Sequence, residues 1–444
     1  MFTNKKILVL GFARSGYDAA KLLLKRNNYV LINDGKERKL HDQDRIEELE
    51  KLGCHFLFGS HPNDLLDESF DYLIKNPGIK IDHPYVLRAH ELNIPVINEV
   101  ELAYKLLPDD VTLIGITGTN GKTTTTTLTY EIMHKAFSER VHLAGNIGYP
   151  LCSILDKLKK DDIIVMEVSC QQSENIHEFH PDVALITNFS PAHIDFFGNY
   201  ENYKRVKSKM FYNQKESNIA ILNYENEDVL NEMKDIKSQV RYFNDNNDCY
   251  LREDAIYYRN EKVIDTKIVK IPGRHNLENC MAAISIAKEF NVSNEVISEV
   301  ISNFIGVRHR LEFIREVEGV RYYNDTEATN IKCTQIALSS FTNPTIIILG
   351  GLERGQNFDD LTPFIKNVKA IIGIGECRNR VLEFGEKNNI NTYIYEYLKD
   401  GFDKIKEISE ENDVVLLSPA SASWDQYKEC EVRGDEFRDL VNKL

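Results

Sequence analysis

Short apolar runs alternate with helical patterns along most of the chain. The first two runs, Ile7–Leu10 and Tyr29–Ile32, flank a segment whose apolar residues recur every three or four positions. Such runs are typical of strands buried on both faces of a parallel sheet, and the spacing between them is typical of a helix packed on that sheet. The same alternation recurs in residues 111–133, 162–187 and 345–418. The pattern therefore predicts an α/β protein with mostly parallel sheets.

The number of these groups fits a chain of several domains. A length of 444 residues predicts about three domains of ~150 residues each. We place the first domain at residues 1–97, the second at 98–306 and the third at 307–444. Residues 218–270 alternate short apolar runs with polar turns, which predicts additional strands or loops on the second domain.

The most specific motif, Gly115–Thr124, lies between a predicted strand and a predicted helix and contains Gly-Lys-Thr. Its glycines allow a tight turn that aims several backbone N–H groups at one anion. Lys122 can add a charge for the outer phosphates, and Thr123 can offer a hydroxyl to Mg²⁺. Gly115 stands one place before the position that the strict phosphate-loop pattern requires. The alternative is an ordinary strand-to-helix turn rich in glycine and threonine.

Two polar side chains follow the next predicted strands. Glu167 ends the run at 162–167, and His193 comes shortly after the run at 183–187. Functional groups gather at the carboxyl ends of parallel strands, so both are candidate Mg²⁺ ligands. A helix cap is the alternative for Glu167, and a structural pair with Asp195 is the alternative for His193.

A helix is predicted over residues 200–214. It carries four basic side chains, and the sequence does not single out one of them for a role: Lys204, Arg205, Lys207 and Lys209.

The first domain opens with part of a dinucleotide-binding fingerprint. Gly11, Gly16 and Asp34 fit it, but Ala13 replaces the middle glycine and weakens a NAD-binding interpretation. The pattern still suits a nucleotide diphosphate at a helix N-terminus, with Asp34 near a sugar or base. A purely structural βαβ unit is the alternative.

Further polar residues are candidates for binding a nucleotide or a carboxylate. Asn276 and Asn279 can read a base or ribose, or cap a helix. Arg310, Arg354 and the serines near residues 418–423 can grip a nucleotide or a carboxylate, although arginine more often lies on a solvated face.

Composition and net charge exclude some classes of binding partner. A net charge of −15 argues against a general nucleic-acid or anionic-membrane binder, but a local basic pocket can still take an anionic substrate. The sequence contains no signal-peptide pattern and no apolar stretch of spanning length, so we expect a cytoplasmic protein without membrane insertion. The eight cysteines are scattered, and we expect reduced, mostly buried thiols.

Taken together, the motifs resemble the Mur ligase family, the ATP-dependent amide-forming enzymes of peptidoglycan precursor synthesis. Segments similar to the family's motifs occur in its order along the chain: residues 117–124, 167–169, 188 with 193, 275–279, 309–310 and 324–326. The resemblance implies a Rossmann-like N-terminal domain for a UDP moiety, a central P-loop ATPase domain, and a Rossmann-like C-terminal domain for an incoming amino acid.

The C-terminal segments 417–427 and 433–437 are similar to the branch of the family that adds D-glutamate to UDP-N-acetylmuramoyl-L-alanine. The implied reaction passes through an acyl phosphate and needs ATP and Mg²⁺, with two metal sites. We expect a monomer. The alternatives are another amino-acid ligase of the family, a folylpolyglutamate-synthase-like enzyme, a P-loop regulatory ATPase or GTPase, and a dehydrogenase. The folate enzyme is disfavoured because it lacks a separate UDP domain.

The resemblance also implies roles for single residues. The residues implied in catalysis are Lys122, His193, Lys207 and Asn146. The residues implied for ATP are Gly118, Thr119, Asn120, Gly121, Lys122, Thr123, Thr124, Asn276, Asn279, Arg310 and Asp325. The implied metal ligands are Thr123, Glu167, His193 and Lys207, the last as a carbamate. The residues implied for UDP are Ser15, Asp34, Lys36 and Gly78, and those for D-glutamate are Thr329, Arg354 and Ser423.

The chain departs from the family pattern at two positions. Glu327 stands where the family usually has lysine, and Cys430 stands where an aromatic residue is often found. A reversed charge at position 327 either alters the binding of an anionic substrate or faces solvent.

Overall fold

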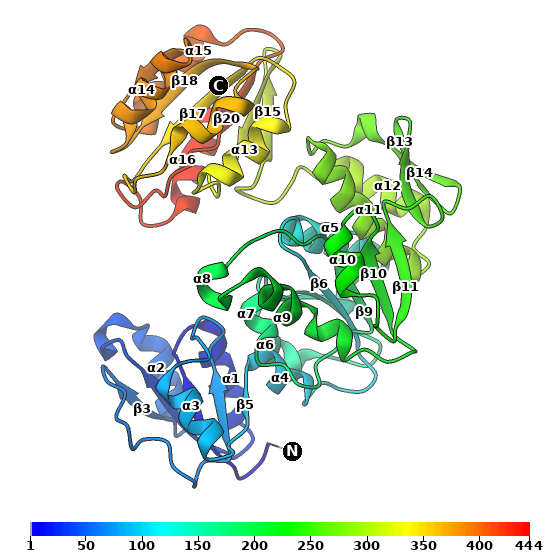
Figure 1. The fold of residues 1–444 in the computed structure, drawn as a ribbon, viewed down its shortest axis with the longest axis vertical. Coiled ribbons are helices and arrows are strands. Elements are labelled where there is room, and N and C mark those ends of the chain that lie inside the picture. The colour runs from blue at the N-terminus through cyan, green and yellow to red at the C-terminus, as the bar shows by residue number, and fades with distance from the viewer. Residues whose placement is uncertain (1) are drawn as a thin grey trace. The chain divides into compact units, whose positions relative to one another are not determined.

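The computed structural model describes residues 2–444. They form two compact units, one reaching to Ile264 and including Asn279–Ser298, the other comprising Asp265–Glu278 and Glu299–Leu444. The first unit contains two sheets and the second unit contains one, and helices connect most of the strands (Figure 1). This arrangement confirms the predicted α/β class, whereas the domain boundaries at residues 97 and 306 stay predictions.

The first sheet is parallel and has the order β3-β2-β1-β4-β5 (blue in Figure 1). Its strands are β1 (Lys6–Leu10), β2 (Tyr29–Asp34), β3 (His55–Phe58), β4 (Tyr72–Lys75) and β5 (Val96–Ile97). Its helices are α1 (Arg14–Leu24), α2 (Gln43–Lys51) and α3 (Pro84–Glu91). The strand order reverses at β1, and in open α/β sheets the crevice at such a point is where ligands bind.

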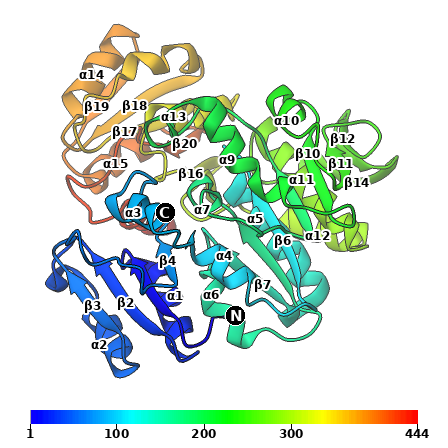
Figure 2. The same ribbon diagram turned by 60° about the horizontal axis from the view of Figure 1, so that its bottom comes forward.

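The second sheet has nine strands in the order β14-β13-β12-β11-β10-β9-β6-β8-β7 (Figure 2). Its strands are β6 (Thr112–Thr117), β7 (Val141–Gly145), β8 (Ile163–Glu167), β9 (Val183–Ile186), β10 (Ile219–Asn223), β11 (Gln239–Phe243), β12 (Cys249–Arg252), β13 (Ala255–Tyr258) and β14 (Glu261–Asp265). The segment 218–270 thus supplies the additional strands that its pattern predicts, and β12 and β13 pair antiparallel.

The helices between residues 98 and 306 vary in length. They are α4 (Glu99–Tyr104), α5 (Lys122–Phe137), α6 (Leu151–Ile154), α7 (Cys170–Ser173), α8 (Ile194–Phe197), α9 (Tyr200–Tyr212), α10 (Glu227–Glu232), α11 (Arg274–Glu289) and α12 (Asn294–Asn303).

The third sheet has six strands in the order β15-β16-β20-β17-β18-β19 (yellow to red in Figure 1). Its strands are β15 (Glu312–Val317), β16 (Val320–Asn324), β17 (Thr345–Gly350), β18 (Val368–Ile374), β19 (Asn391–Ile394) and β20 (Val414–Leu417). Its helices are α13 (Ile331–Ser339), α14 (Arg378–Lys387), α15 (Leu398–Ile408) and α16 (Cys430–Asn442). The apolar runs identify β17, β18 and β20, whereas the edge strands β15 and β19 are half-exposed and carry weaker patterns.

Strand β17 explains why these runs are continuous. Ile347 and Leu349 pack in the cluster that includes residues of α13 and α14, whereas Ile346 and Ile348 pack in the cluster that includes residues of α15 and α16. Successive side chains of a strand point to opposite faces, and here both faces are covered by helices.

A buried ion pair links the first sheet of the first unit to the end of α7. Lys75 ends β4, and its Nζ lies 2.9 Å from Glu174 Oε2, with side-chain exposures of 0% and 6%. Glu101, which is also buried, accepts hydrogen bonds from the backbone N–H groups of residues 177–179. Charged groups at this depth are tolerated only when they are paired or hydrogen-bonded.

Two further features concern the whole described chain. Within residues 2–444, no helix is both long and apolar enough to cross a lipid bilayer. All eight cysteines lie in the described part and none forms a disulfide, and six of them are buried.

We expect the Lys75→Met and Glu174→Leu variants each to lose about 3–5 kcal/mol of unfolding free energy, because either change leaves one buried charge unpaired. The double variant should recover most of that loss. Chemical denaturation followed by circular dichroism measures these differences.

The exposed pair between Lys25 and Asp156 is the matched control, since it also joins a residue before position 98 to one after it, at 2.7 Å, but both side chains are 47% exposed. Lys25→Met should cost at most about 1 kcal/mol. Equal losses of unfolding free energy at both pairs would contradict the argument that breaking a buried ion pair costs more than breaking an exposed one.

Candidate active site

The loop between β6 and α5 has a backbone that only glycine fits at two positions. Gly118 has a φ of 145°, and a Cβ there would lie 1.8 Å from Thr187 Oγ1. Gly121 has a φ of 80° and precedes the first residue of α5, Lys122. The helix N-terminus therefore starts directly at the loop, as an anion-binding turn requires.

The loop that follows β9 fixes this conformation. The backbone N–H of Thr119 donates to the carbonyl of Asn188 at 2.8 Å, and that of Asn120 donates to Asn188 Oδ1 at 3.1 Å. The side-chain amide of Asn188 donates in return to the carbonyl of Asn120 at 3.2 Å. Lys122 Nζ donates to the Thr119 carbonyl at 2.9 Å, so its ammonium lies over the loop.

Glu167 lies at the same sheet edge, because it pairs in register with Ile116 of β6. Its Oε1 accepts a hydrogen bond from Asn146 Nδ2 at 2.7 Å. The residue is 1% exposed, and its Oε2 finds no hydrogen-bond partner among residues 2–444. A buried carboxylate oxygen without a donor fits a hard cation such as Mg²⁺, and the structure brings the predicted Glu167 and Asn146 together.

Of the four basic side chains in α9, Lys207 alone points to this edge. It is 1% exposed, its Nζ lies 3.4 Å from Thr117 Oγ1, and it lies 5.2 Å from the ring centre of Tyr203. Burial, and then the charge of Lys122, lowers the pKa of Lys207 to about 7. The other three have other partners: Lys204 pairs with Glu201 and Asp228, Lys209 donates to the Glu174 carbonyl, and Arg205 donates to Asn202.

His193 immediately precedes α8 and has a left-handed backbone with a φ of 51°. Desolvation, and then the charges of Lys207 and Lys122, lowers the pKa of His193. The imidazole is therefore neutral near pH 7, which is the form that binds metal ions. Its low pKa also reflects that it lies within electrostatic reach of both lysines.

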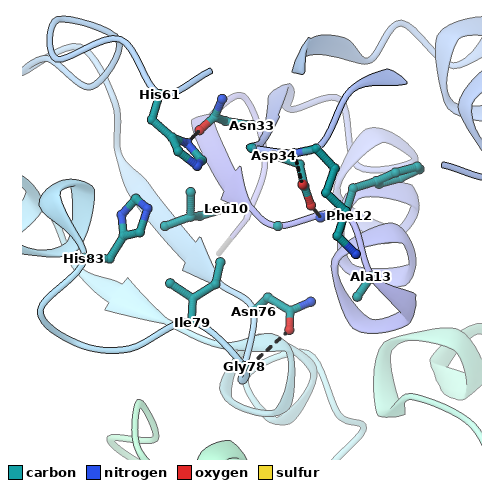
Figure 3. A pocket seen from close by; sticks show the side chains of 13 residues that line it. Leu10, Phe12, Ala13, Asn33, Asp34, His61, Asn76, Gly78, Ile79 and His83 are labelled. Atoms are coloured by element: carbon teal, nitrogen blue, oxygen red, sulfur yellow. Dashed lines mark hydrogen bonds between the residues drawn. The ribbon is translucent and has the colours of Figure 1, made fainter. Parts of the chain in front are cut away.

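A pocket of about 400 Å³ lies at the carboxyl ends of β1, β2 and β4 (Figure 3). Asp34, Lys36 and Gly78 line it, whereas Ser15 does not and instead accepts a hydrogen bond from the lining residue Asn76 at 3.2 Å.

The carboxylate of Asp34 holds the surrounding turns, since it accepts from the backbone N–H of Phe12 at 2.8 Å and that of Lys36 at 2.9 Å. His61 and His83 also line this pocket, and no sequence pattern had singled them out.

In the second unit, Asp325 follows β16 and is buried. It accepts hydrogen bonds from Ser418 Oγ at 2.7 Å and from the backbone N–H of Leu311 at 3.1 Å. Burial raises the pKa of Asp325 to about 7.

The two departures from the family pattern lie near one another. Glu327 pairs with Arg310 at 3.1 Å, and the Cys430 thiol donates to Glu431 at 3.3 Å. Ligand atoms of Glu327, Cys430 and Glu431 lie within 4.8 Å of one another. Glu327 therefore has a partner within its own unit instead of simply facing solvent.

A second pocket, of about 460 Å³, contains part of the predicted amino-acid site. Thr329 and Arg354 line it. Ser423 is not in the lining: it is 1% exposed, and its Oγ has no hydrogen-bond partner among residues 2–444. Lys332 and Gln356 also line the pocket and had not been identified from the sequence.

Known proteins match nearly the whole length of this chain. A family model described as the Mur ligase middle domain matches residues 116–287, and one described as the MurD-like N-terminal domain of Mur ligases matches residues 5–98. The chain is 44% identical to UDP-N-acetylmuramoylalanine--D-glutamate ligase of Enterococcus hirae, over 99% of this chain and 96% of the relative. The chain belongs to the Mur ligase family.

A second relative of this Mur ligase agrees with the first. The chain is 41% identical to UDP-N-acetylmuramoylalanine--D-glutamate ligase of Bacillus cereus (strain G9842), over 100% of this chain and 98% of the relative.

Solved structures confirm the fold with three α/β domains. MurF from Acinetobacter baumannii matches at a TM-score of 0.60 and 16% identity, over 97% of this chain and 93% of that one. MurF from Thermotoga maritima, solved in complex with ADP, matches at a TM-score of 0.56 and 17% identity, over 94% of this chain and 95% of that one. Mur ligases use ATP, and the backbone at residues 118–124 has the shape that the predicted phosphate-binding loop requires.

We expect Gly118→Ala to weaken ATP binding at least about tenfold, because a non-glycine backbone at this φ costs about 1–3 kcal/mol and the added Cβ also collides with Thr187. Isothermal titration calorimetry measures the Kd.

Gly198→Ala is the matched control, since Gly198 has a φ of 82° but a Cβ there meets no atom within 4 Å. That variant should bind ATP as the wild type does. An equal loss in both variants would mean that the loss of ATP binding is not specific to the loop at Gly118.

Proposed function

We propose that this Mur ligase joins D-glutamate to UDP-N-acetylmuramoyl-L-alanine with hydrolysis of ATP, in cytoplasmic peptidoglycan precursor synthesis. Full-length relatives at 41–44% identity carry this activity in their names. The observation that carries the chemistry is the single sheet edge at which the phosphate loop, Glu167 and Lys207 meet.

The chain's own groups suit an acyl-phosphate route. The alanyl carboxylate attacks the γ-phosphorus of ATP, so a C–O–P bond forms and the bond to ADP breaks. The amine of D-glutamate then attacks the acyl carbon, the amide forms, and phosphate leaves. Lys122 and the N–H groups of the loop neutralise and orient the phosphates, and Asn146 lies beside Glu167 where it can contact the substrate near its carboxylate.

The metal ligands are part of the proposal. Mg²⁺, when bound, would screen the charge of the phosphates. Thr123 and Glu167 are assigned to one ion, and His193 with Lys207 to a second. The donor-free oxygen of Glu167 and the neutral imidazole of His193 support this assignment.

Lys207 would act as a carbamate. A pKa near 7 leaves a large fraction of the amine uncharged at neutral pH, and only an uncharged amine reacts with carbon dioxide. The product replaces a buried cation with an anionic oxygen ligand, which removes the repulsion with Lys122 and suits a hard metal.

The other binding roles stay proposals. Ser15, Asp34, Lys36 and Gly78 are assigned to the UDP moiety, which the pocket at β1 supports. Thr329, Arg354 and Ser423 are assigned to D-glutamate, and the hydroxyl of Ser423, which has no partner among residues 2–444, supports its share. Asn276, Asn279, Arg310 and Asp325 are assigned to ATP. A monomer with domains at 1–97, 98–306 and 307–444 completes the proposal.

We expect phosphate release to require ATP, Mg²⁺, UDP-N-acetylmuramoyl-L-alanine and D-glutamate together. A coupled phosphate assay that omits one component at a time measures this. Turnover with L-lysine or meso-diaminopimelate in place of D-glutamate would reassign the chain to another amino-acid ligase of the family. Release from ATP alone at the full rate would point to a P-loop ATPase that is not a ligase.

We expect Lys207→Ala to lose activity by at least about 100-fold and to regain part of it with added acetate or formate, since a small carboxylate can supply the missing anionic oxygens. The same phosphate assay, run with and without the added acids, measures the rescue.

Lys204→Ala is the matched control on the same helix, because Lys204 pairs with Glu201 and Asp228 instead of facing the sheet edge. It should keep most of its activity and gain nothing from carboxylates. Full activity in Lys207→Ala would show that the carbamate is misassigned.

A further inference from the structure

Arg354 holds a positive charge that the protein leaves uncompensated. Within residues 2–444 its guanidinium makes no ion pair and no side-chain hydrogen bond, and only its backbone N–H is bonded, to Gln356 Oε1 at 2.9 Å. The neighbouring Glu353 is already occupied, because it accepts from Arg380 at 2.6 Å and from the backbone N–H of Gly355 at 2.7 Å. In a chain of net charge −15, a free guanidinium at a pocket is a site for an anion.

Trp424 is the side chain that contacts this guanidinium. The Cζ of Arg354 lies 5.5 Å from the centre of the ring, within the range of a cation–π interaction. Trp424 is 63% exposed, which is unusual for the largest apolar side chain. It directly follows the buried Ser423 that we assign to the same amino acid.

The turn that carries Trp424 is fixed despite this exposure. The backbone N–H groups of Gln426 and Tyr427 both donate to the carbonyl of Ser423, at 3.0 and 2.8 Å. Asp425 accepts from the backbone N–H of Glu376 at 3.1 Å. The indole therefore extends into solvent from a rigid support.

The loop that carries Arg354 is tied to this turn. The backbone N–H of Leu352 donates to the carbonyl of Ala422 at 2.9 Å, and Gln356 Nε2 donates to Ser421 Oγ at 2.6 Å. Arg433, which is 1% exposed, donates to the carbonyls of Ser421 at 3.1 Å and Gly350 at 3.4 Å. The fold thus sets the spacing of Arg354 and Trp424.

A cation–π contact with an aromatic ring leaves the N–H donors of an arginine available for a ligand. A carboxylate partner would use the N–H groups of the guanidinium, whereas a ring face attracts the cation and leaves its planar edge of N–H donors available. That edge matches a carboxylate in a bidentate geometry.

We propose that Trp424 is a positioning residue that holds the guanidinium of Arg354 ready for a carboxylate of the incoming amino acid. The inference rests on the proposed function, because it takes D-glutamate as the occupant of this pocket. Trp424 acts through Arg354 and makes no bond to the reacting atoms.

The kinetic test uses the full chain with ATP and UDP-N-acetylmuramoyl-L-alanine at saturation. Trp424→Leu should raise the KM for D-glutamate about two- to fivefold, the range expected from losing one exposed cation–π contact, with kcat and the KM for ATP within about twofold of wild type. Trp424→Phe keeps an aromatic face and should keep the KM for D-glutamate close to the wild-type value. In an Arg354→Gln background, Trp424→Leu should have no further effect on this KM.

Tyr397→Leu is the matched control, because Lys399 lies over the Tyr397 ring at the same 5.5 Å and Tyr397 is also exposed. It should leave the KM for D-glutamate unchanged. If Trp424→Leu also leaves it unchanged while the wild type uses D-glutamate, the inference is overturned and the proposed function stands. A wild type that does not use D-glutamate overturns the proposed function, and the inference with it.

A second measurement tests the contact without any substrate. Trp424 is the single tryptophan of the chain, so intrinsic fluorescence reports on it alone. Arg354→Gln should raise the acrylamide quenching constant of this fluorescence, because it uncovers one face of the ring. Lys332→Gln removes a charge from the same pocket and should leave the quenching unchanged. Equal quenching in wild type and Arg354→Gln would overturn the inference.

Discussion

Parallel pairing of β6 with β8 on one side and β9 on the other positions every residue of the proposed nucleotide site that lies at this sheet edge. The register places Ile116 opposite Glu167 and Thr117 opposite Ile186, so the three strands end at one edge of the sheet. The phosphate loop, the acid and the segment around Asn188 come together there although they are distant in the sequence. Glycine at 118 is required because Thr187 of the neighbouring strand end occupies the space of a side chain.

The charges at this edge are costly to the folded protein in the absence of ligands. Lys207 is buried near the positive charge of Lys122, and Glu167 keeps an oxygen without a hydrogen-bond donor among residues 2–444. Buried groups with shifted pKa values and unpaired polar atoms concentrate where a protein binds ions or carries out chemistry. The repulsion between the two lysines favours the binding of phosphates at this edge, and the donor-free oxygen of Glu167 favours a divalent cation.

In the second unit, a buried arginine holds together several loops that line or border one pocket. Arg433 is buried and donates to the carbonyls of Thr326, Gly350 and Ser421, three residues at the ends of different strands. A planar guanidinium offers five donors from three nitrogens, whereas a lysine ammonium offers three donors from one nitrogen, so arginine can reach carbonyls that lie further apart. Arg354 is its exposed counterpart, and among residues 2–444 its guanidinium donates to no backbone carbonyl.

Local periodicity and the short-range chemistry of glycine were enough to predict the α/β class, the Gly-Lys-Thr turn and Glu167 as a strand-end acid, because each depends on residues close together in the chain. The helical pattern alone could not choose Lys207 over Lys204 and Lys209, and that choice came from the family resemblance. Lys204 and Lys207 are both buried, and tertiary contacts decide that Lys207 is the one that reaches Thr117. No local pattern identified His61 and His83, because they line the pocket only through loops that meet in the folded chain. The resemblance assigned Asp34 to UDP, which stays a prediction, and the structure adds that this pocket-lining carboxylate also accepts from two backbone N–H groups. Burial, register and the pairing of charges could not be predicted in this way, because they depend on contacts between segments far apart in the chain.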